Sequence, residues 1–203
     1  MKKISKATLK RYPIYLKALN KLKKMGKDKV MSSELAEFTS IQPTTIRRDF
    51  SLLGSLGKQG YGYDIDSLIE IFSRCLGVDY DEKIILVGAG NFGKAILNYN
   101  HWDNVVGEIV CAFDKYPEKC GELSVPLYHI DDLENKIPEG CHIAIICISG
   151  DIQTTVDRLV SLGINGIVDF TREHFTVPKN VHLRNVDVVS TIQEIVFEAN
   201  EMQ

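Results

Sequence analysis

Long hydrophobic runs are missing from this chain of 203 residues. The longest apolar run is the six residues 143–148, whereas a helix that crosses a bilayer needs about 20. The first six residues are basic but lack the apolar stretch of about 7–15 residues that a secretory signal requires. We therefore expect a protein without a membrane span that stays in the cytoplasm. With 44% hydrophobic and 25% charged residues, the chain is also unlike a disordered one.

Cysteine is scarce, and its spacing forms no recognised pattern. The five cysteines include no Cys-x-x-Cys pair, and no histidine stands at metal-ligand spacing from them. This excludes a disulfide framework and gives no support to a zinc site. Apolar neighbours of Cys75, Cys111 and Cys147 predict reduced core thiols, with a redox-sensing thiol as the alternative.

Positive charge is concentrated in the N-terminal third. Residues 1–63 hold 14 Lys and Arg against 4 Asp and Glu, a net charge of +10, while residues 64–203 carry −13. Together they give the net charge of −3. Two domains with different partners follow, and the basic one suits phosphate groups of a nucleic acid.

The basic segment begins with an amphipathic helix. Its apolar residues are Tyr12, Tyr15, Leu16, Leu19 and Leu22. Their spacing is helical and Gly26 provides a stop, while Pro13 predicts either the start of the helix or a bend in it.

Two short helices follow and predict a helix-turn-helix. Ser32 or Ser33 can cap the first, and Pro43 suits the first position of the second. The second helix buries Ile46, Phe50 and Leu53. It then presents to solvent the residues Thr44, Thr45, Arg47 and Arg48. Arginine binds guanine edges or phosphates, and threonine binds phosphate oxygens or a thymine methyl, so we expect this face to bind DNA.

A glycine-rich segment, residues 54–63, comes next. It predicts a tight hairpin, a wing whose tip approaches a DNA groove, and includes Lys58, Gly60 and Tyr61. A flexible linker is the alternative. A helix capped by Asp64 or Asp66 and stopped by Gly77 then closes the domain, so we place its boundary near residue 78.

A dinucleotide-binding motif opens the second domain. The apolar run of residues 83–87 leads directly into a Gly-x-Gly-x-x-Gly turn and a helical stretch. The turn consists of Gly88, Ala89, Gly90, Asn91, Phe92 and Gly93. Between a buried strand and a helix, such glycines allow a tight turn and let backbone amides meet a pyrophosphate.

An acid stands where the motif requires one. The apolar run 109–113 ends in Asp114, 21 residues beyond Gly93. A carboxylate there accepts hydrogen bonds from the adenosine ribose and repels a 2′-phosphate, which favours NAD(H) over NADP(H). The neighbouring Lys115 weakens this preference only slightly.

Further alternation of strands and helices predicts an α/β, Rossmann-like, doubly wound parallel sheet. The expected strands are 125–128, 142–148, 166–170 and 181–185, with helices from 131 and over 152–162. A last helix over 190–202 carries an apolar stripe that packs either on its own subunit or on a partner, making a dimer. The predicted division is 1–77 for the DNA-binding domain, 78–185 for the NAD(H)-binding domain and 186–203 for a dimerisation helix.

Catalytic groups are not evident. The sheet domain leaves no room for a separate substrate domain, and no histidine has an acid–base partner pattern. The histidines are His101, His129, His142, His174 and His182. We therefore expect a sensor rather than an enzyme, without catalytic residues or a metal. The alternatives are a small NAD-dependent oxidoreductase and a module for CoA or another adenine nucleotide.

Over essentially its whole length the sequence resembles the Rex family of redox-sensing transcriptional repressors. The resemblance rests on residues 44–51 (TTIRRDFS), 57–63 (GKQGYGY), 88–93 (GAGNFG), 113–114 (FD) and 185–187 (NVD). It implies a homodimer that binds palindromic operators, represses genes of fermentative or respiratory NADH reoxidation, and leaves the DNA when NADH binds. NAD+ competes weakly and supports DNA binding.

The resemblance also implies roles for particular residues. The helix with Arg47 and Arg48 enters the major groove, the wing approaches the minor groove, and the C-terminal helix is exchanged between subunits. Arg11, Tyr99 and Asp187 resemble ligand-dependent contacts between domains: Arg11 pairs with Asp187 of the partner subunit, and Tyr99 competes for that acid. Tyr99 is thus also expected near the cofactor. One departure, residues 147–150 (CISG) in place of a Thr-Val-Pro-like turn, predicts an altered response to NADH.

Overall fold

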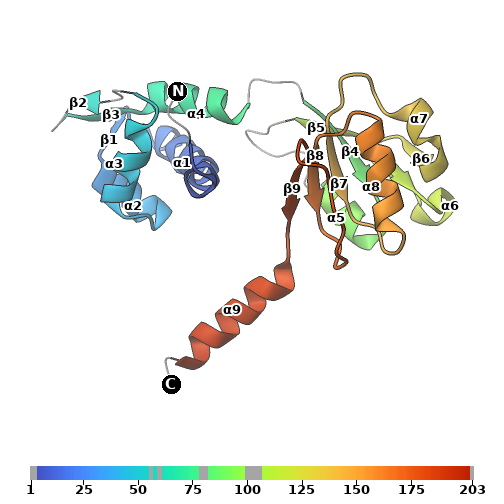
Figure 1. The fold of residues 1–203 in the computed structure, drawn as a ribbon. Helices are drawn as coiled ribbons and strands as arrows, with labels where there is room; N and C mark the ends of the chain where they lie inside the picture. The colour runs from blue at the N-terminus through green and yellow to red at the C-terminus, as the bar shows by residue number, and fades with distance from the viewer. Residues whose placement is uncertain (1–3, 55–56, 59–60, 78–81, 99–106, 202–203) are drawn as a thin grey trace. The chain divides into compact units, whose positions relative to one another are not determined.

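A computed structural model of the protein describes residues 4–54, 57–58, 61–77, 82–98 and 107–201. The chain forms two compact units, residues 1–80 and 81–203 (Figure 1). The predicted boundary near residue 78 lies outside the described residues. The predicted three-part division stays a prediction, and each unit is described by itself.

The N-terminal unit is a winged helix-turn-helix. Its elements are α1 (Lys6–Lys24), β1 (Lys29–Val30), α2 (Ser32–Thr39), α3 (Pro43–Ser51), β2 (Gly57–Lys58), β3 (Gly62–Asp64) and α4 (Ile65–Leu76). The three strands form an antiparallel sheet in the order β1-β3-β2. Because β2 pairs with β3, the glycine-rich segment contains the predicted hairpin rather than a flexible linker.

The first helix does not start at Pro13. It begins at Lys6, after Ser5, whose side chain accepts a hydrogen bond from the Thr8 amide, and it continues through Pro13. Pro13 cannot donate to the carbonyl of Leu9, but both residues lie on the exposed face, where water can serve that carbonyl. Tyr12 before the proline and Tyr15 after it are buried, so packing holds the helix on both sides of Pro13.

The predicted serine cap of α2 is wrong. The N-cap residue is Met31, and no side chain caps the helix. The Ser32 hydroxyl instead accepts a hydrogen bond from Nη1 of Arg47 at 2.8 Å. The cap of α4 is confirmed, because Asp64 accepts from the Ser67 amide and Gly77 ends the helix with a φ of 71°.

An aromatic cluster forms the core of this unit. Tyr15, Phe50 and Phe72 are buried, and their ring centroids lie 5.4–5.8 Å from one another. Burying one such side chain stabilises a fold by about 1.5–3 kcal/mol. Phe50 and Ile46 come from α3, as the sequence predicted, and they fix which face of that helix is left to solvent.

The C-terminal unit is a parallel sheet with helices on both faces (Figure 1). Its strands are β4 (Lys83–Val87), β5 (Glu108–Asp114), β6 (Leu127–His129), β7 (Ile143–Ile146), β8 (Gly166–Asp169) and β9 (His182–Asn185). Its helices are α5 (Asn91–Asn98), α6 (Pro117–Cys120), the 3-10 turn η1 (Ile130–Asp132), α7 (Leu133–Lys136), α8 (Ile152–Ser161) and α9 (Val188–Glu201).

The strand order is that of a dinucleotide-binding sheet. Across the sheet it reads β6-β5-β4-β7-β8-β9, and all pairs are parallel. Counted within this unit, that is 3-2-1-4-5-6, the doubly wound order with a switch point between β4 and β7. The predicted Rossmann-like fold is confirmed.

Alternate residues of the central strand serve the two helical layers. Ile85 and Val87 belong to the core under α7 and α8, which supplies Val156 and Leu159. Ile84 and Leu86 belong to the opposite core, with Leu97 of α5 and Cys120 of α6. Strands buried on both faces read as continuous apolar runs, which is why the sequence revealed them.

Several predicted bounds differ from the observed ones. The helix expected from residue 131 is reduced to η1 and α7, because Pro138 follows within two residues of Lys136 and stops the helix. The last helix begins at Val188, two residues earlier than predicted, and every described residue from 186 to 201 is exposed. In the described ranges, no helix is both long and apolar enough to cross a membrane.

Of the three cysteines that the sequence placed in the core, Cys111 is buried, whereas Cys75 and Cys147 are half-buried. All five are free; three are buried and two half-buried. Among the residues that the structure describes, no group of three or more His, Cys, Asp and Glu side chains is placed to hold a metal ion.

Candidate nucleic-acid interface and dinucleotide site

Helix α3 presents its polar residues as the sequence predicted. Ile46, Asp49 and Phe50 anchor the helix in the core. The opposite face consists of the exposed Thr44, Arg47 and Arg48 and the half-buried Thr45. The hydrogen bond from Nη1 of Arg47 to Ser32 orients this arginine, while its other nitrogens have no partner in the described part of the chain. Such a face can bind phosphates and base edges.

The hairpin of the wing requires a glycine at position 62. At Gly62, φ is +74°, and an added Cβ would lie 2.9 Å from the Val30 carbonyl oxygen, so only glycine fits there. Lys58 lies in β2, and Tyr61 is 73% exposed just before β3. Gly60 lies outside the described residues. A large exposed aromatic residue beside a tight hairpin suits contact with a groove.

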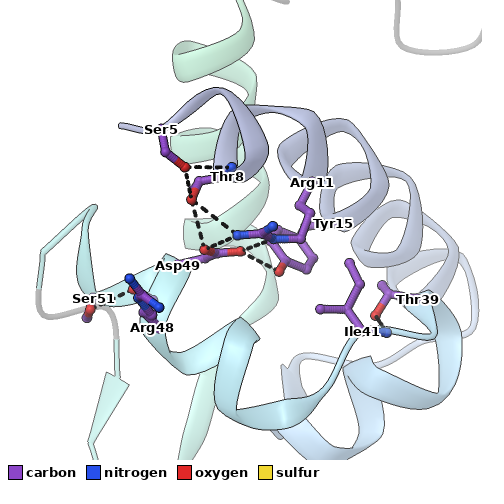
Figure 2. Close-up of polar contacts among 9 residues, drawn as sticks. All are labelled: Ser5, Thr8, Arg11, Tyr15, Thr39, Ile41, Arg48, Asp49 and Ser51. Carbon is purple, nitrogen blue, oxygen red and sulfur yellow. Dashed lines mark hydrogen bonds and ion pairs between the residues drawn. The ribbon is translucent and has the colours of Figure 1, made fainter. Parts of the chain in front are cut away.

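A buried ion pair ties α3 to α1 (Figure 2). The Arg11 guanidinium donates from Nε to Asp49 Oδ2 at 2.6 Å and from Nη2 to Oδ1 at 2.7 Å. Tyr15 and Thr8 also donate to this carboxylate. Burial raises the pKa of Asp49, but hydrogen bonds from Arg11 and Tyr15 and the Arg11 charge outweigh it, so the pKa lies below its usual value.

The same contacts affect the two donors. Burial raises the pKa of Tyr15, and its hydrogen bond to Asp49 raises it further. The hydrogen bond to Asp49 also raises the pKa of Arg11. Because the folded pKa of Asp49 is lowered, its carboxylate stabilises the fold above the unfolded pKa of about 3.9, and this stabilisation is lost as the pH falls below that value.

The sequence analysis did not foresee this role of Asp49, although a signal was present. Asp49 stands between Ile46 and Phe50 on the stripe that α3 buries, where an unpaired charge is costly. Arg11 was assigned to Asp187 of a partner subunit. Within one chain, Arg11 pairs with Asp49, and Asp187 accepts from Ser190 Oγ at 2.5 Å and from the Val189 amide at 2.9 Å. A link between subunits stays a prediction, and Tyr99 lies outside the described residues.

Three glycines of the motif have three different surroundings. At Gly88, φ is +100°, and an added Cβ would lie 2.7 Å from the Cys147 carbonyl. At Gly93, it would lie 2.0 Å from the carbonyl oxygen of Gly88, so the start of α5 lies directly on the turn. At Gly90, no atom lies within 4 Å. The turn and the helix packing therefore need Gly88 and Gly93, whereas Gly90 leaves open space for a ligand to approach the backbone.

The turn lies at the switch point of the sheet. The Gly88 amide donates to the Phe113 carbonyl of β5 at 2.8 Å, and the Cys147 amide donates to the Val87 carbonyl at 2.7 Å. The loops after β4, β5 and β7 thus meet at the carboxyl edge, where sheets of this order bind dinucleotides. Ala89, Asn91 and Phe92 belong to the same turn or to the start of α5, and Phe92 is 45% exposed.

Asp114 is fixed beside this turn. Its Oδ2 accepts from the Ala89 amide and its Oδ1 from the Tyr116 amide, both at 2.8 Å. A carboxylate accepts about four hydrogen bonds, so these two amides do not exhaust its capacity. Lys115 and Lys119 flank the Tyr116 ring, with Nζ 5.7 and 4.2 Å from its centroid. The predicted adenosine end of the site therefore combines a carboxylate held by two backbone amides with two nearby cations.

The loop after β7 carries the departure noted in the sequence. Burial, with the charge of Asp169, raises the pKa of the Cys147 thiol to about 12, so the thiol stays neutral. The Gly150 amide donates to Oε1 of Glu173 at 3.2 Å. No sequence pattern placed this carboxylate at the predicted nicotinamide end.

The fold and these sites define a class of protein in which a winged helix-turn-helix head and a dinucleotide-binding sheet share one chain. Two family models match it: "Putative DNA-binding protein N-terminus" over residues 3–51 and "CoA binding domain" over residues 79–173. The first model matches part of the N-terminal unit and the second matches most of the C-terminal unit.

Curated relatives match almost the full chain. It is 42% identical over 198 residues to the redox-sensing transcriptional repressor Rex of a Geobacillus species, with 96% of this chain and 92% of the relative covered. It is 40% identical to the Rex repressor of Listeria innocua, with 96% and 93% covered. The chain belongs to the Rex family of redox-sensing transcriptional repressors.

Solved structures of a Rex-family repressor match the whole chain in fold. The structure of RSP with beta-NAD+ and operator DNA is 32% identical, with a TM-score of 0.90 over 100% of this chain and 95% of that one. The structure of RSP with beta-NADH is 30% identical, with a TM-score of 0.86 over 100% and 97%. The fold predicted from the sequence and the family it resembled are confirmed.

Proposed function

We propose that this protein is a redox-sensing transcriptional repressor that binds palindromic operator DNA as a homodimer and is released when NADH binds. The observation that carries the proposal is the full-length match to a repressor solved with both beta-NAD+ and operator DNA. Both required surfaces, the exposed face of α3 and the open turn at Gly90, are present in this chain. Because operator DNA and NADH occur together in the cytoplasm, the protein acts there.

On the DNA side, α3 lies in the major groove. Arg47 and Arg48 bind guanine edges or phosphates, and Thr44 and Thr45 bind phosphates or thymine methyl groups. The wing, with Lys58, Gly60 and Tyr61, approaches the neighbouring minor groove. The net charge of +10 on residues 1–63 supports association with DNA.

On the ligand side, the turn from Gly88 to Gly93 holds the pyrophosphate of NADH or NAD+. Asp114 binds the adenosine ribose, and Lys115 lies beside it. Tyr99 also contacts the cofactor, and the loop of residues 147–150 serves its nicotinamide end. NAD+ carries a positive charge on its nicotinamide that NADH lacks, so a sensor that responds to NADH in the presence of NAD+ must bind the neutral ring more tightly.

The coupling between the two sites uses Arg11, Tyr99 and Asp187. Nη1 of Arg11 has no partner in the described part of the chain, and the side chain is 25% exposed. Arg11 can therefore keep its bonds to Asp49 and also pair with Asp187 of the partner subunit. Tyr99 competes for that acid in the NADH-bound state, which changes the orientation of the heads.

Helix α9 supplies the dimer contact. Its apolar stripe of Val188, Ile192, Ile195, Val196 and Ala199 is exposed in the single chain. Replacing Ile192 by arginine places a charge in the middle of this stripe. We expect the dimer to dissociate, because burying an unpaired charge costs several kcal/mol.

Light scattering after size exclusion measures the change in mass. Glu194→Gln, on the opposite face of α9, changes the charge by the same amount and is expected to leave the dimer intact. A dimeric Ile192→Arg variant would show that the subunits associate elsewhere.

Replacing Asp114 by alanine tests the ligand site. We expect NADH affinity to fall about 10- to 100-fold, because hydrogen bonds to a charged group contribute about 1.5–3 kcal/mol. Operator binding without nucleotide is expected to persist. Calorimetry with NADH and anisotropy with labelled DNA measure the two quantities.

Asp114→Asn, which keeps the shape and one acceptor, is the matched control and should lie between wild type and Asp114→Ala. If operator binding falls as far as NADH affinity, the role of Asp114 is structural, because it also holds the Ala89 and Tyr116 amides.

Experiments can also distinguish the two alternative functions, an oxidoreductase and a CoA-binding module. An oxidoreductase would oxidise or reduce the nicotinamide with a substrate, but the named relatives are repressors and not enzymes. The second family model carries the name of CoA. Asp114 argues for free ribose hydroxyls, whereas CoA carries a 3′-phosphate there, so CoA is expected not to displace NADH.

A further inference from the structure

Helix α3 buries one acidic side chain on its apolar face. Asp49 is 1% exposed, and its neighbours on that face are Ile46 and Phe50. A carboxylate in such a place is tolerated only when its oxygens are fully hydrogen-bonded. The position therefore demands partners, and they determine how α3 is held.

All of these partners come from α1 (Figure 2). Asp49 Oδ2 accepts from Arg11 Nε at 2.6 Å and from the Tyr15 hydroxyl at 2.7 Å. Asp49 Oδ1 accepts from Arg11 Nη2 at 2.7 Å and from the Thr8 hydroxyl at 3.3 Å. Ser5 extends the cluster, because its hydroxyl donates to Thr8 Oγ1 at 3.0 Å. Each carboxylate oxygen thus has two donors from one helix.

The hydrogen bonds of this cluster fix the orientation of α3 relative to α1, which apolar packing alone leaves free. The rings of Tyr15 and Phe50 meet edge to face at 5.4 Å, and such contacts tolerate small rotations and shifts. A two-bond arginine–carboxylate pair does not, because both bonds require the guanidinium and carboxylate planes to coincide. Asp49 directly follows Arg47 and Arg48 in the same turn of α3, so its orientation determines theirs.

We propose that Asp49 is the positioning residue of the DNA-reading helix, and that its bonds to Arg11 and Tyr15 set the angle at which α3 presents Arg47 and Arg48. The proposal rests on the proposed function, since it requires α3 to read DNA. Asp49 points into the core and touches no DNA, yet sequence-specific affinity depends on it. Non-specific affinity, which follows the number of cations, does not.

The test compares two labelled duplexes in anisotropy titrations of the full-length protein without nucleotide. One is selected by the wild-type protein from a randomised library, and the other is a scrambled sequence of the same length. Asp49→Asn removes one negative charge, so electrostatics alone would tighten both complexes. Glu37→Gln, at an exposed position of α2, removes the same charge and serves as the matched control.

We expect Asp49→Asn to lower affinity for the selected duplex about tenfold or more, with affinity for the scrambled duplex unchanged or higher. Tyr15→Phe, which loses only one hydroxyl, should lose specificity in the same direction while remaining folded by circular dichroism. The double variant should lose no more than Asp49→Asn alone, because the two residues act through one cluster.

Three outcomes would overturn the proposal. In the first, folded Asp49→Asn and Tyr15→Phe keep the wild-type ratio of the two affinities. In the second, both affinities fall together in proportion to lost thermal stability, which makes the cluster merely structural. In the third, the wild-type protein itself selects no duplex over scrambled DNA; this rejects the proposed function as well, and is thereby distinct from the first two.

Discussion

Replacing Gly93 by alanine is expected to destabilise the sheet unit by about 3 kcal/mol. The new Cβ would lie 2.0 Å from the Gly88 carbonyl oxygen and 3.0 Å from its carbonyl carbon. Both are backbone atoms of a turn that hydrogen bonds fix to β5, so the start of α5 must move away. Overpacking of this kind costs about 1–3 kcal/mol and occasionally more. Urea denaturation followed by circular dichroism measures the free energy of unfolding.

Gly90→Ala is the matched variant. We expect it to lower NADH affinity and to leave stability nearly unchanged. No protein atom lies within 4 Å of the added Cβ, so we expect stability to change by less than about 1 kcal/mol. The methyl group instead occupies the space through which a pyrophosphate approaches the backbone, so NADH affinity should fall about tenfold or more. A Gly90→Ala variant that binds NADH like wild type would mean that the pyrophosphate does not lie against this turn. Equal stability of the two variants would contradict the observed contact at Gly93.

Replacing Arg47 and Arg48 together by alanine is expected to reduce operator affinity at least a hundredfold at about 0.15 M salt. Each arginine that reads a base contributes about 1–3 kcal/mol, and each phosphate contact adds about one to the slope of log K against log salt. NADH affinity should stay unchanged, because the two residues lie in the other compact unit. Anisotropy titrations over a range of salt concentrations measure both affinity and slope.

The control for this experiment removes the same charge elsewhere. Lys17 and Lys24 are exposed residues of α1. Replacing both by alanine should lower affinity for operator and scrambled DNA by similar, smaller factors. If the arginine variant loses no more operator affinity than this control, α3 is not the reading helix.

The sequence predicted the parts of the fold that local patterns determine. A strand buried on both faces, the glycine turn and Asp114 lie in fixed order along the chain, and the structure places Asp114 against the Ala89 amide. The polar face of α3 followed in the same way from the spacing of Ile46 and Phe50. The sequence left open whether a helix starts or bends at Pro13, and the helix continues through that residue because buried side chains on both sides hold it in the core. The serine cap predicted for α2 was wrong, because the Ser32 hydroxyl accepts a hydrogen bond from Arg47 instead.

The contact that the sequence could not reveal joins Arg11 to Asp49, 38 residues apart. Local periodicity shows that α1 and α3 are amphipathic, but not which residues of the two helices face each other. The exposed stripe of α9 was foreseen from the same periodicity, and its full exposure in the single chain agrees with a helix that packs on a second subunit. Pairings between helices thus required the structure.

The central claim is that one chain reads DNA through α3 and responds to NADH through the sheet. Fluorescence anisotropy of a labelled duplex, selected by the protein from a randomised library, tests this most directly when NADH and NAD+ are titrated separately at fixed salt. We predict that NADH releases the DNA, that NAD+ at equal concentration does not, and that the ratio of operator affinities with and without NADH equals the coupling between the sites. Operator binding that ignores both nucleotides, or is lost equally with each, would contradict the account.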